Sequence, residues 1–160
     1  LGSCRHGNLL INKRHNEVRT LIADAFRQKG FTVHEEIPCK AVNGSDRRLD
    51  ILVINKKKNE ALLLDPTIRL ERGDGSDQFD SVDKEKKAIY EPCIPYLLDT
   101  CGLDKIDVHG LYIGSRGALT KRLTNLVKSF GLGNELLKTI SKSVIKNSTI
   151  IIHNHLYSCV

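Results

Sequence analysis

The sequence predicts a mixed fold of the α/β or α+β class, in which helices flank a single sheet. Helical and strand patterns follow one another in the order helix, three strands, helix, strand and two helices. Short apolar runs rich in β-branched residues indicate the strands, and apolar residues three or four positions apart indicate the helices. A chain of 160 residues is long enough to bury a core as one domain.

The first half of the chain begins with a helix predicted over residues 14–29, whose apolar residues share one face. Gly30 ends it, because glycine tolerates the left-handed conformation at a helix C-terminus. Residues 31–37 are predicted as a strand that enters a loop at Pro38. The next two strands are joined by a basic turn at residues 55–59, so we expect a hairpin.

The second half is predicted to contain three helices and one strand. Proline disfavours a helical conformation in the residue before it, so the helix that begins near Gln78 ends at Tyr90, ahead of Pro92. The β-branched tail at residues 148–152 is compatible with a strand or a helix. The predicted segments are a loop (69–77), a helix (78–90), an irregular stretch (91–105), a strand (106–113) and two helices (119–129 and 134–146).

Composition favours a polyanionic partner, because the formal net charge is +6. No apolar run approaches the ~20 residues of a membrane-spanning helix, and no signal peptide is visible at the N-terminus. The five cysteines form no Cys-x-x-Cys pair, which favours free thiols over a disulfide framework. Methionine is absent, which indicates a fragment of a longer protein or a processed product.

Two aspartates in the predicted hairpin are the strongest candidates for chemistry. Asp50 lies within one apolar run and Asp65 ends the next. A buried carboxylate is costly unless it is paired or bound to a metal, so two on neighbouring strands are well placed to share a divalent cation. Oxygen ligands suit Mg²⁺ or Mn²⁺, and the carbonyl of Pro66 could add another. Alternatively, Asp50 pairs with Arg47 or Arg48, and Asp65 caps a turn.

A cation beside such a site would orient the attacking water and offset negative charge on a phosphate. The nearest candidates, Lys84, Lys86 and Lys87, lie on the helix predicted after the hairpin. Lys86 and Tyr90 are four residues apart and therefore share one face of that helix. A solvated helix face, with Tyr90 as a packing residue, is the alternative interpretation.

The order of these motifs resembles a known family. Arg48-x-Asp50, fourteen residues, Asp65 and then Lys86-x-x-x-Tyr90 is similar to the restriction-like endonuclease domain of site-specific non-LTR retrotransposons. That domain belongs to the PD-(D/E)XK nuclease superfamily, which also contains archaeal Holliday-junction resolvases. Arg14-His15-Asn16 resembles the R-H-N signature of the family. Residues 31–36 and 108–117 resemble two of its strands, so the resemblance covers residues 12–155.

The resemblance implies a restriction-endonuclease-like mixed sheet flanked by helices, with Asp50 and Asp65 as metal ligands. Lys86 would be the displaced catalytic lysine, and Tyr90 the aromatic residue one turn later. Leu49 stands where the family usually has proline. Thr67 stands where the terminal lysine of the superfamily would be, so activity would depend on Lys86.

Further acids and bases complete the predicted site. Glu36 is a candidate metal ligand, and Glu17 could correspond to the first-helix acid of the resolvases, although their residue type alone favours a surface role for both. His15 is expected to contact phosphate or cap the first helix. Phosphate contacts are predicted for a basic set, Arg14, Lys56, Lys57, Lys58 and Arg116.

The N-terminal residues 1–11 are predicted as a tail, and residues 12–160 as a single endonuclease-like domain. Retrotransposon proteins of this family carry a Cys-Cys-His-Cys zinc knuckle just before the nuclease. Cys4 falls about where its last ligand would be, so the tail is interpreted as the remnant of a knuckle. Cys4 and His6 supply at most two of the four ligands of a structural zinc site.

The predicted function is therefore a metal-dependent DNA endonuclease that nicks a target strand. By resemblance, the free 3′ end would prime reverse transcription by another domain of the parent polyprotein, in the nucleus. One alternative is a junction resolvase acting as a homodimer. The other is a degenerate, noncatalytic DNA-binding module.

Overall fold

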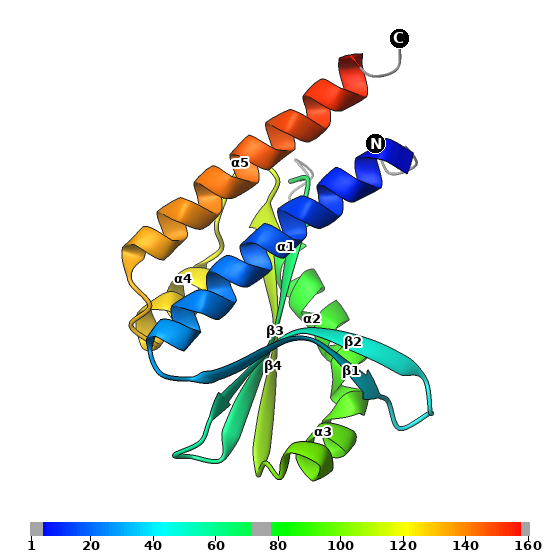
Figure 1. Cartoon of the computed structure of the whole chain (residues 1–160), viewed down its shortest axis with the longest axis vertical. Helices are drawn as coiled ribbons and strands as arrows, with labels where there is room; N and C mark the ends of the chain where they lie inside the picture. Colours follow the sequence, from blue (N-terminus) through cyan, green and yellow to red (C-terminus); the bar gives the residue numbers. More distant parts are fainter. Residues whose placement is uncertain (1–4, 72–77, 158–160) are drawn as a thin grey trace.

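A four-stranded mixed sheet flanked by helices forms the core of the protein, which confirms the predicted fold class (Figure 1). The computed structural model describes residues 5–71 and 78–157. The helices are α1 (Arg5–Gln28), α2 (Gln78–Tyr90), the 3₁₀ turn η1 (Glu91–Cys93), α3 (Ile94–Cys101), α4 (Lys121–Ser129) and α5 (Asn134–Tyr157). The strands are β1 (Thr32–Lys40), β2 (Asp46–Asn55), β3 (Glu60–Arg69) and β4 (Lys105–Gly114).

The strands lie in the order β1-β2-β3-β4. The pairs β1–β2 and β2–β3 are antiparallel, so the predicted hairpin is confirmed. Strands β3 and β4 are parallel, and a parallel pair needs a crossover connection. The chain makes that crossover through α2 and α3, which therefore lie against one face of the sheet.

Each face of the sheet is covered by its own set of helices. Helices α1, α4 and α5 pack on one face, where Phe26, Val53 and Val144 belong to one apolar cluster. Helices α2 and α3 pack on the other face, where Leu63 and Leu97 belong to a second cluster. Figure 1 shows α1 and α5 running side by side above the sheet, with the first turns of α1 near the last turns of α5.

Two predicted boundaries in the helical layers are wrong by several residues, and one helix was not predicted. Helix α1 begins at Arg5, well before residue 14, and α5 continues to Tyr157 beyond residue 146. The β-branched tail is thus helical, because α5 packs along α1 and this tertiary contact overrides local strand propensity. The stretch predicted as irregular contains α3, whose proline lies in the first turn, where its missing N–H costs nothing.

The strand that was predicted to stop at Pro38 continues through it to Lys40. Strand β1 is an edge strand, where a residue without an N–H group is tolerated. The predicted strand at 106–113 extends by one residue at each end. Most of the predicted loop at 69–77 lies outside the described residues.

At the N-terminus, residues 5–11 belong to α1 and not to a separate tail. Cys4 lies outside the described residues, so the interpretation of a zinc-knuckle remnant stays a prediction. Cys39, Cys93 and Cys101 are free thiols, as predicted. Within residues 5–71 and 78–157, no helix is both long and apolar enough to cross a membrane.

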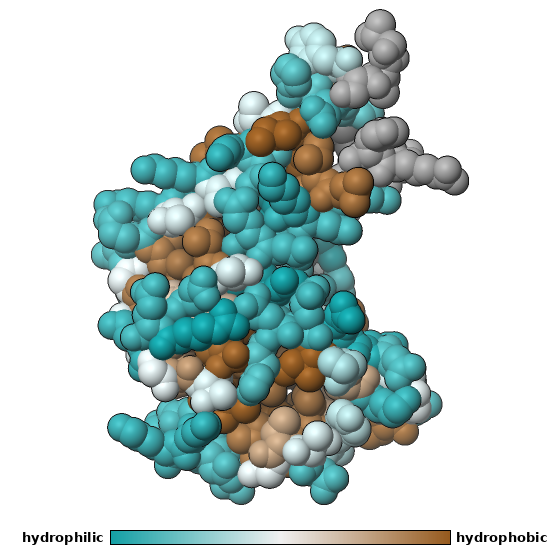
Figure 2. Space-filling model, in the orientation of Figure 1, coloured by the Kyte–Doolittle hydropathy of each residue, from teal (hydrophilic) through white to brown (hydrophobic). Residues whose placement is uncertain are grey.

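Apolar side chains also reach the surface of the two long helices. Leu9 on α1 and Ile152 and Leu156 on α5 are exposed. Figure 2 shows brown apolar patches between polar residues in the region of these helices. The outer turns of α5 therefore continue past the core of the molecule, which ends on this helix near Val144 and Asn147.

Helix α2 lies unusually close to β4 at Gly110. A methyl group added to Gly110 would lie 2.8 Å from the carbonyl oxygen of Val82 and 3.0 Å from Cγ of Lys86. The backbone N–H of Gly110 donates to Oδ1 of Asp83 over 3.0 Å. Asp83 also pairs with Lys87 and with Arg122 of α4, so this buried carboxylate ties α2 to β4 and α4.

We expect Gly110→Ala to destabilise the protein by about 1–3 kcal/mol, because the added methyl group overpacks a contact between backbones. Urea denaturation of both proteins measures the effect. Ser81→Ala, on the exposed side of α2, is the control and should stay within about 0.5 kcal/mol of the wild type. Equal stability of Gly110→Ala and wild type would show that the helix moves away freely.

Candidate functional site

Strands β2 and β3 separate at the point where the two predicted aspartates lie. The last registered pair at this end is Ile51 with Leu64, and the next residues outward are Asp50 and Asp65. Continuing the register would place them opposite each other, and residues opposite across an antiparallel pair share a face. Both line one cleft of about 370 Å³, between α1 and α2. The structure therefore brings the two carboxylates together.

Asp65 is buried, with 2% of its surface exposed, and three donors hold it. The hydroxyl of Tyr90 donates to Oδ2 over 2.8 Å. The hydroxyl of Thr67 donates to Oδ1 over 3.0 Å, and Nζ of Lys86 lies 3.1 Å from the same oxygen. From the sequence, Thr67 is notable only because it stands where the superfamily has a lysine. In the structure its hydroxyl helps to fix this carboxylate.

Burial raises the pKa of Asp65, and the charge of Asp50 raises it further. Lys86 and Tyr90 act in the opposite direction by stabilising the charged form. The pKa of Tyr90 is raised as well, mainly by burial and then by Asp65, so its hydroxyl remains a proton donor. Two negative groups in one partly buried cleft favour a bound cation.

Asp50 is held from the opposite wall of the cleft. Nε2 of His15, on α1, lies 3.0 Å from Oδ2 of Asp50. This hydrogen bond is the main reason why the pKa of His15 is raised above its ordinary value, with burial opposing it. The alternative partners do not take this role: Arg47 donates to the carbonyl of Asp46, and Arg48 lies 4.0 Å from Glu36.

Of the three lysines proposed on α2, Lys86 alone lines the cleft. Lys84 is exposed, and Lys87 pairs with Asp83 over 2.9 Å. Lys86 and Tyr90 both reach Asp65, as their four-residue spacing predicted. Pro66 also lines the cleft, and its carbonyl stays a predicted ligand.

The other two acids considered do not join the aspartates. Glu36 has a positive φ of 52° and lies 2.9 Å from Nη1 of Arg19, outside the cleft lining. Glu17 accepts hydrogen bonds from Ser143 and Asn147 of α5. Among the residues that the structure describes, no group of three or more His, Cys, Asp or Glu side chains gathers for a metal. The cleft itself offers two carboxylates.

The predicted phosphate contacts separate into two groups. Arg14 and His15 line the cleft. Residues 56–58 lie in the β2–β3 turn, beyond the strand ends Asn55 and Glu60, which are each five residues along a strand from an aspartate, or ~16 Å. Arg116 is exposed in the turn after β4 and pairs with Glu71 over 3.2 Å. The structure therefore does not place this second group at the carboxylates.

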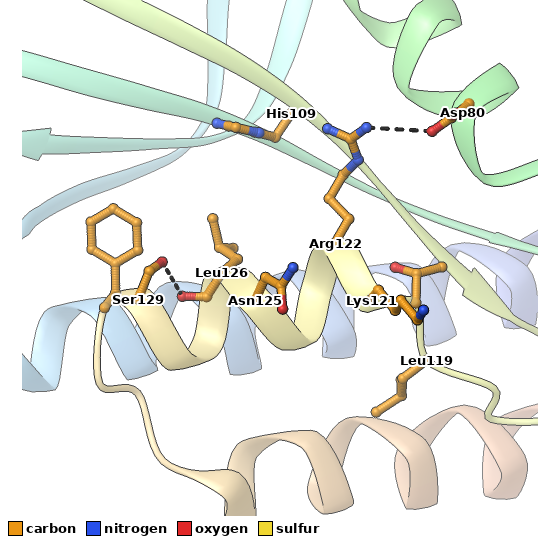
Figure 3. Close-up of a pocket in the computed structure, with 10 residues that line it drawn as sticks. Asp80, His109, Leu119, Lys121, Arg122, Asn125, Leu126 and Ser129 are labelled. Atoms are coloured by element: carbon orange, nitrogen blue, oxygen red, sulfur yellow. Dashed lines mark hydrogen bonds and ion pairs between the residues drawn. The ribbon is translucent and has the colours of Figure 1, made fainter.

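A larger cavity of about 850 Å³, not anticipated from the sequence, runs along α4 (Figure 3). His109 of β4 and Asn125 and Phe130 of the α4 region line it. Figure 3 shows Arg122 directed at Asp80, at 3.6 Å, and Arg122 also pairs with Asp83. Neither candidate aspartate lines this cavity, so it is separate from the cleft.

No protein-family model matches the chain, and no curated protein matches it. A solved crystal structure that it resembles is that of AF1548, a protein of unknown function. The two are 11% identical with a TM-score of 0.40, over 88% of this chain and 99% of that one. A likeness at this distance carries no argument about function.

Tyr90→Phe should destabilise the protein by about 1–3 kcal/mol, because it leaves Oδ2 of the buried Asp65 without its donor. The loss should be larger at pH 8 than at pH 4, because the raised pKa of Asp65 favours its neutral form at the lower pH and that form depends less on the donor. Urea denaturation at both pH values measures this. Tyr96→Phe, on the exposed side of α3, is the control. A pH-independent loss would assign Tyr90 a packing role alone.

The His15–Asp50 contact predicts a second pH dependence. Since the pKa of His15 is raised on folding, its contribution is fully present below its unfolded-state pKa of ~6.5. That contribution is lost as pH rises through the folded-state pKa. The difference in unfolding free energy between wild type and His15→Gln, measured with EDTA, should therefore shrink from pH 6 to pH 9. His34→Gln, an exposed position on β1, is the control. A constant difference would contradict the charged pair.

Proposed function

We propose that this chain is a metal-dependent DNA endonuclease domain that nicks one strand of its target. One observation carries the proposal: Asp50 and Asp65 line a single cleft where two strands separate, and the ammonium of Lys86 lies 3.1 Å from Asp65. Two carboxylates with an adjacent cation are the groups that metal-assisted phosphodiester hydrolysis requires. The net positive charge of the chain supports a polyanionic substrate.

The two carboxylates of the cleft suit a hard divalent cation. The charge of Asp50 contributes to the raised pKa of Asp65, which shows that the two groups repel each other. A cation between them would relieve this repulsion. Mg²⁺ commonly takes one or two carboxylates and completes its shell with water and substrate phosphate. When bound, Mg²⁺ or Mn²⁺ would lower the pKa of a water and polarise the phosphate.

Each residue of the cleft would have its own role in the reaction. Asp50 and Asp65 would hold the cation, with the carbonyl of Pro66 as a further oxygen. Lys86 would orient the attacking water and offset negative charge as the phosphate reacts. Tyr90 and Thr67 fix the position of Asp65 by donating to its two oxygens.

We propose DNA contacts at two distances from the reacting phosphate. Arg14 and His15 would contact the strand within the cleft. Residues 56–58, more than ~16 Å away along the sheet, and Arg116 would contact phosphates further along, since each DNA strand carries a charge every ~3.4 Å. The nick would supply a 3′ end to a reverse transcriptase domain of the parent polyprotein, in the nucleus.

A nicking assay with Mg²⁺ tests the proposal. Asp50→Asn and Asp65→Asn should each lower the nicking rate by about a hundredfold or more, because each removes a metal-binding charge and keeps the shape. Asp46→Asn, an exposed position on the same strand as Asp50, is the matched control and should keep its activity. EDTA should abolish nicking by the wild type.

Three results would contradict the proposal. Equal nicking by wild type, Asp50→Asn and Asp65→Asn would refute the metal assignment. Binding of DNA without cleavage under any divalent cation would favour the noncatalytic module. Cleavage of four-way junctions in symmetric pairs, by a dimer, would favour the resolvase.

A further inference from the structure

Helix α1 carries two buried arginines whose surroundings differ. Arg14 is 9% exposed and Arg19 is 8% exposed. Nε of Arg19 lies 3.0 Å from Glu35, and its Nη1 lies 2.9 Å from Glu36, so its charge is balanced. Within the described residues, Arg14 makes one hydrogen bond, which it donates from Nη1 to the hydroxyl of Ser148 over 2.7 Å. No carboxylate among the described residues forms an ion pair with it.

The Nε–H group of Arg14 is buried and has no hydrogen-bond partner in the part of the chain that the structure describes. An unpaired buried charge is expensive, and an unsatisfied buried donor in a native protein calls for an explanation. Burial lowers the pKa of Arg14, but a guanidinium stays protonated under ordinary conditions. Arg14 is therefore a cation that no anion among residues 5–71 and 78–157 balances.

The position of Arg14 identifies where the missing anion would come from. It lines the cleft that holds Asp50 and Asp65. The next residue, His15, contacts Asp50 from the α1 wall of the cleft, while Lys86 forms an ion pair with Asp65 from the α2 wall. In the cavity along α4, by contrast, Arg122 is already paired with Asp80 and Asp83. The unbalanced positive charge thus belongs to the cleft.

We propose that Arg14 is a subsite for a second phosphate of the DNA strand, the one flanking the phosphodiester at Asp50 and Asp65. This inference rests on the proposed function. A guanidinium presents paired N–H donors that match phosphate oxygens. Ser148 holds Arg14 when no strand is bound, and the guanidinium turns from Ser148 toward the phosphate on binding. The substrate is therefore a strand with at least two phosphates.

Binding in EDTA tests the subsite without depending on cleavage. The probes are inorganic phosphate and a single-stranded oligothymidylate, titrated calorimetrically. Arg14→Gln should weaken oligonucleotide binding about tenfold or more and abolish detectable phosphate binding, because a charge-assisted hydrogen bond is lost. Arg19→Gln is the matched control from the same helix and should bind like the wild type. Equal affinities for wild type and Arg14→Gln would overturn the subsite.

Ser148→Asp separates a binding role from a structural one. The new carboxylate would lie beside Arg14 and balance its charge, so the protein should fold with equal or greater stability. The same pairing would occupy the guanidinium and weaken oligonucleotide binding about as much as Arg14→Gln does. A stabilised Ser148→Asp protein that binds the oligonucleotide like the wild type would show that Arg14 only joins α1 to α5.

Cleavage kinetics distinguish whether Arg14 contacts the flanking phosphate or the reacting one. Bis(p-nitrophenyl) phosphate contains one phosphodiester and no flanking phosphate. If Arg14 binds the flanking phosphate, Arg14→Gln should lower kcat/KM for an oligonucleotide at least about tenfold more than for this ester. Equal losses would place Arg14 at the reacting phosphate and overturn the flanking assignment. A protein that binds as predicted in EDTA but cleaves neither substrate would refute the proposed function and leave the anion subsite supported.

Discussion

The buried carboxylate of Asp65 is the constraint on which the site depends. Burial makes its charge costly, so donors must be supplied from the surrounding structure. Thr67 supplies one from the same strand, and Lys86 and Tyr90 supply two from α2. The position of α2 against the sheet is therefore linked to the ionisation of one side chain.

Contacts of α2 with β4 and α4 also fix the position of this helix. Gly110 lets α2 approach β4 closely, and Asp83 ties the helix to the backbone of Gly110 and to Arg122 of α4. Lys86 lies one turn after Asp83 on the same helix, next to Gly110. A contact that looks purely structural thus sets where the ammonium group stands relative to Asp65. Displacement of α2 would cost both packing and the charge balance of the cleft.

The sequence predicted the hairpin and the two aspartates because local patterns determine both. Alternation and a polar turn define the strands, and equal distances from the turn place Asp50 opposite Asp65. The same symmetry implies that residues 56–58 lie at the far end of the strands, an inference available from the sequence. The four-residue spacing of Lys86 and Tyr90 was sufficient to place both on one side of α2.

Features that depend on contacts between distant segments could not be predicted. The helical tail of α5 is stabilised by α1, and the hydrogen bonds Glu17–Asn147 and Arg14–Ser148 join residues 130 and 134 positions apart. Glu36 carries a carboxylate that could bind a metal, but in the fold this carboxylate pairs with Arg19 of α1. The burial of Arg14 has the same origin, since α5 covers it.

The cleft is thus asymmetric in charge, and this asymmetry bears on how a polyanion could enter it. The carboxylates repel phosphate, so a strand would approach favourably only along walls that carry positive charge. His15 on one wall and Lys86 on the other are each engaged by an aspartate. Arg14 is the cation of the cleft lining that no carboxylate among the described residues balances. Attraction of the strand would therefore come first from α1, and the approach to the carboxylates would follow once a metal ion offsets their charge.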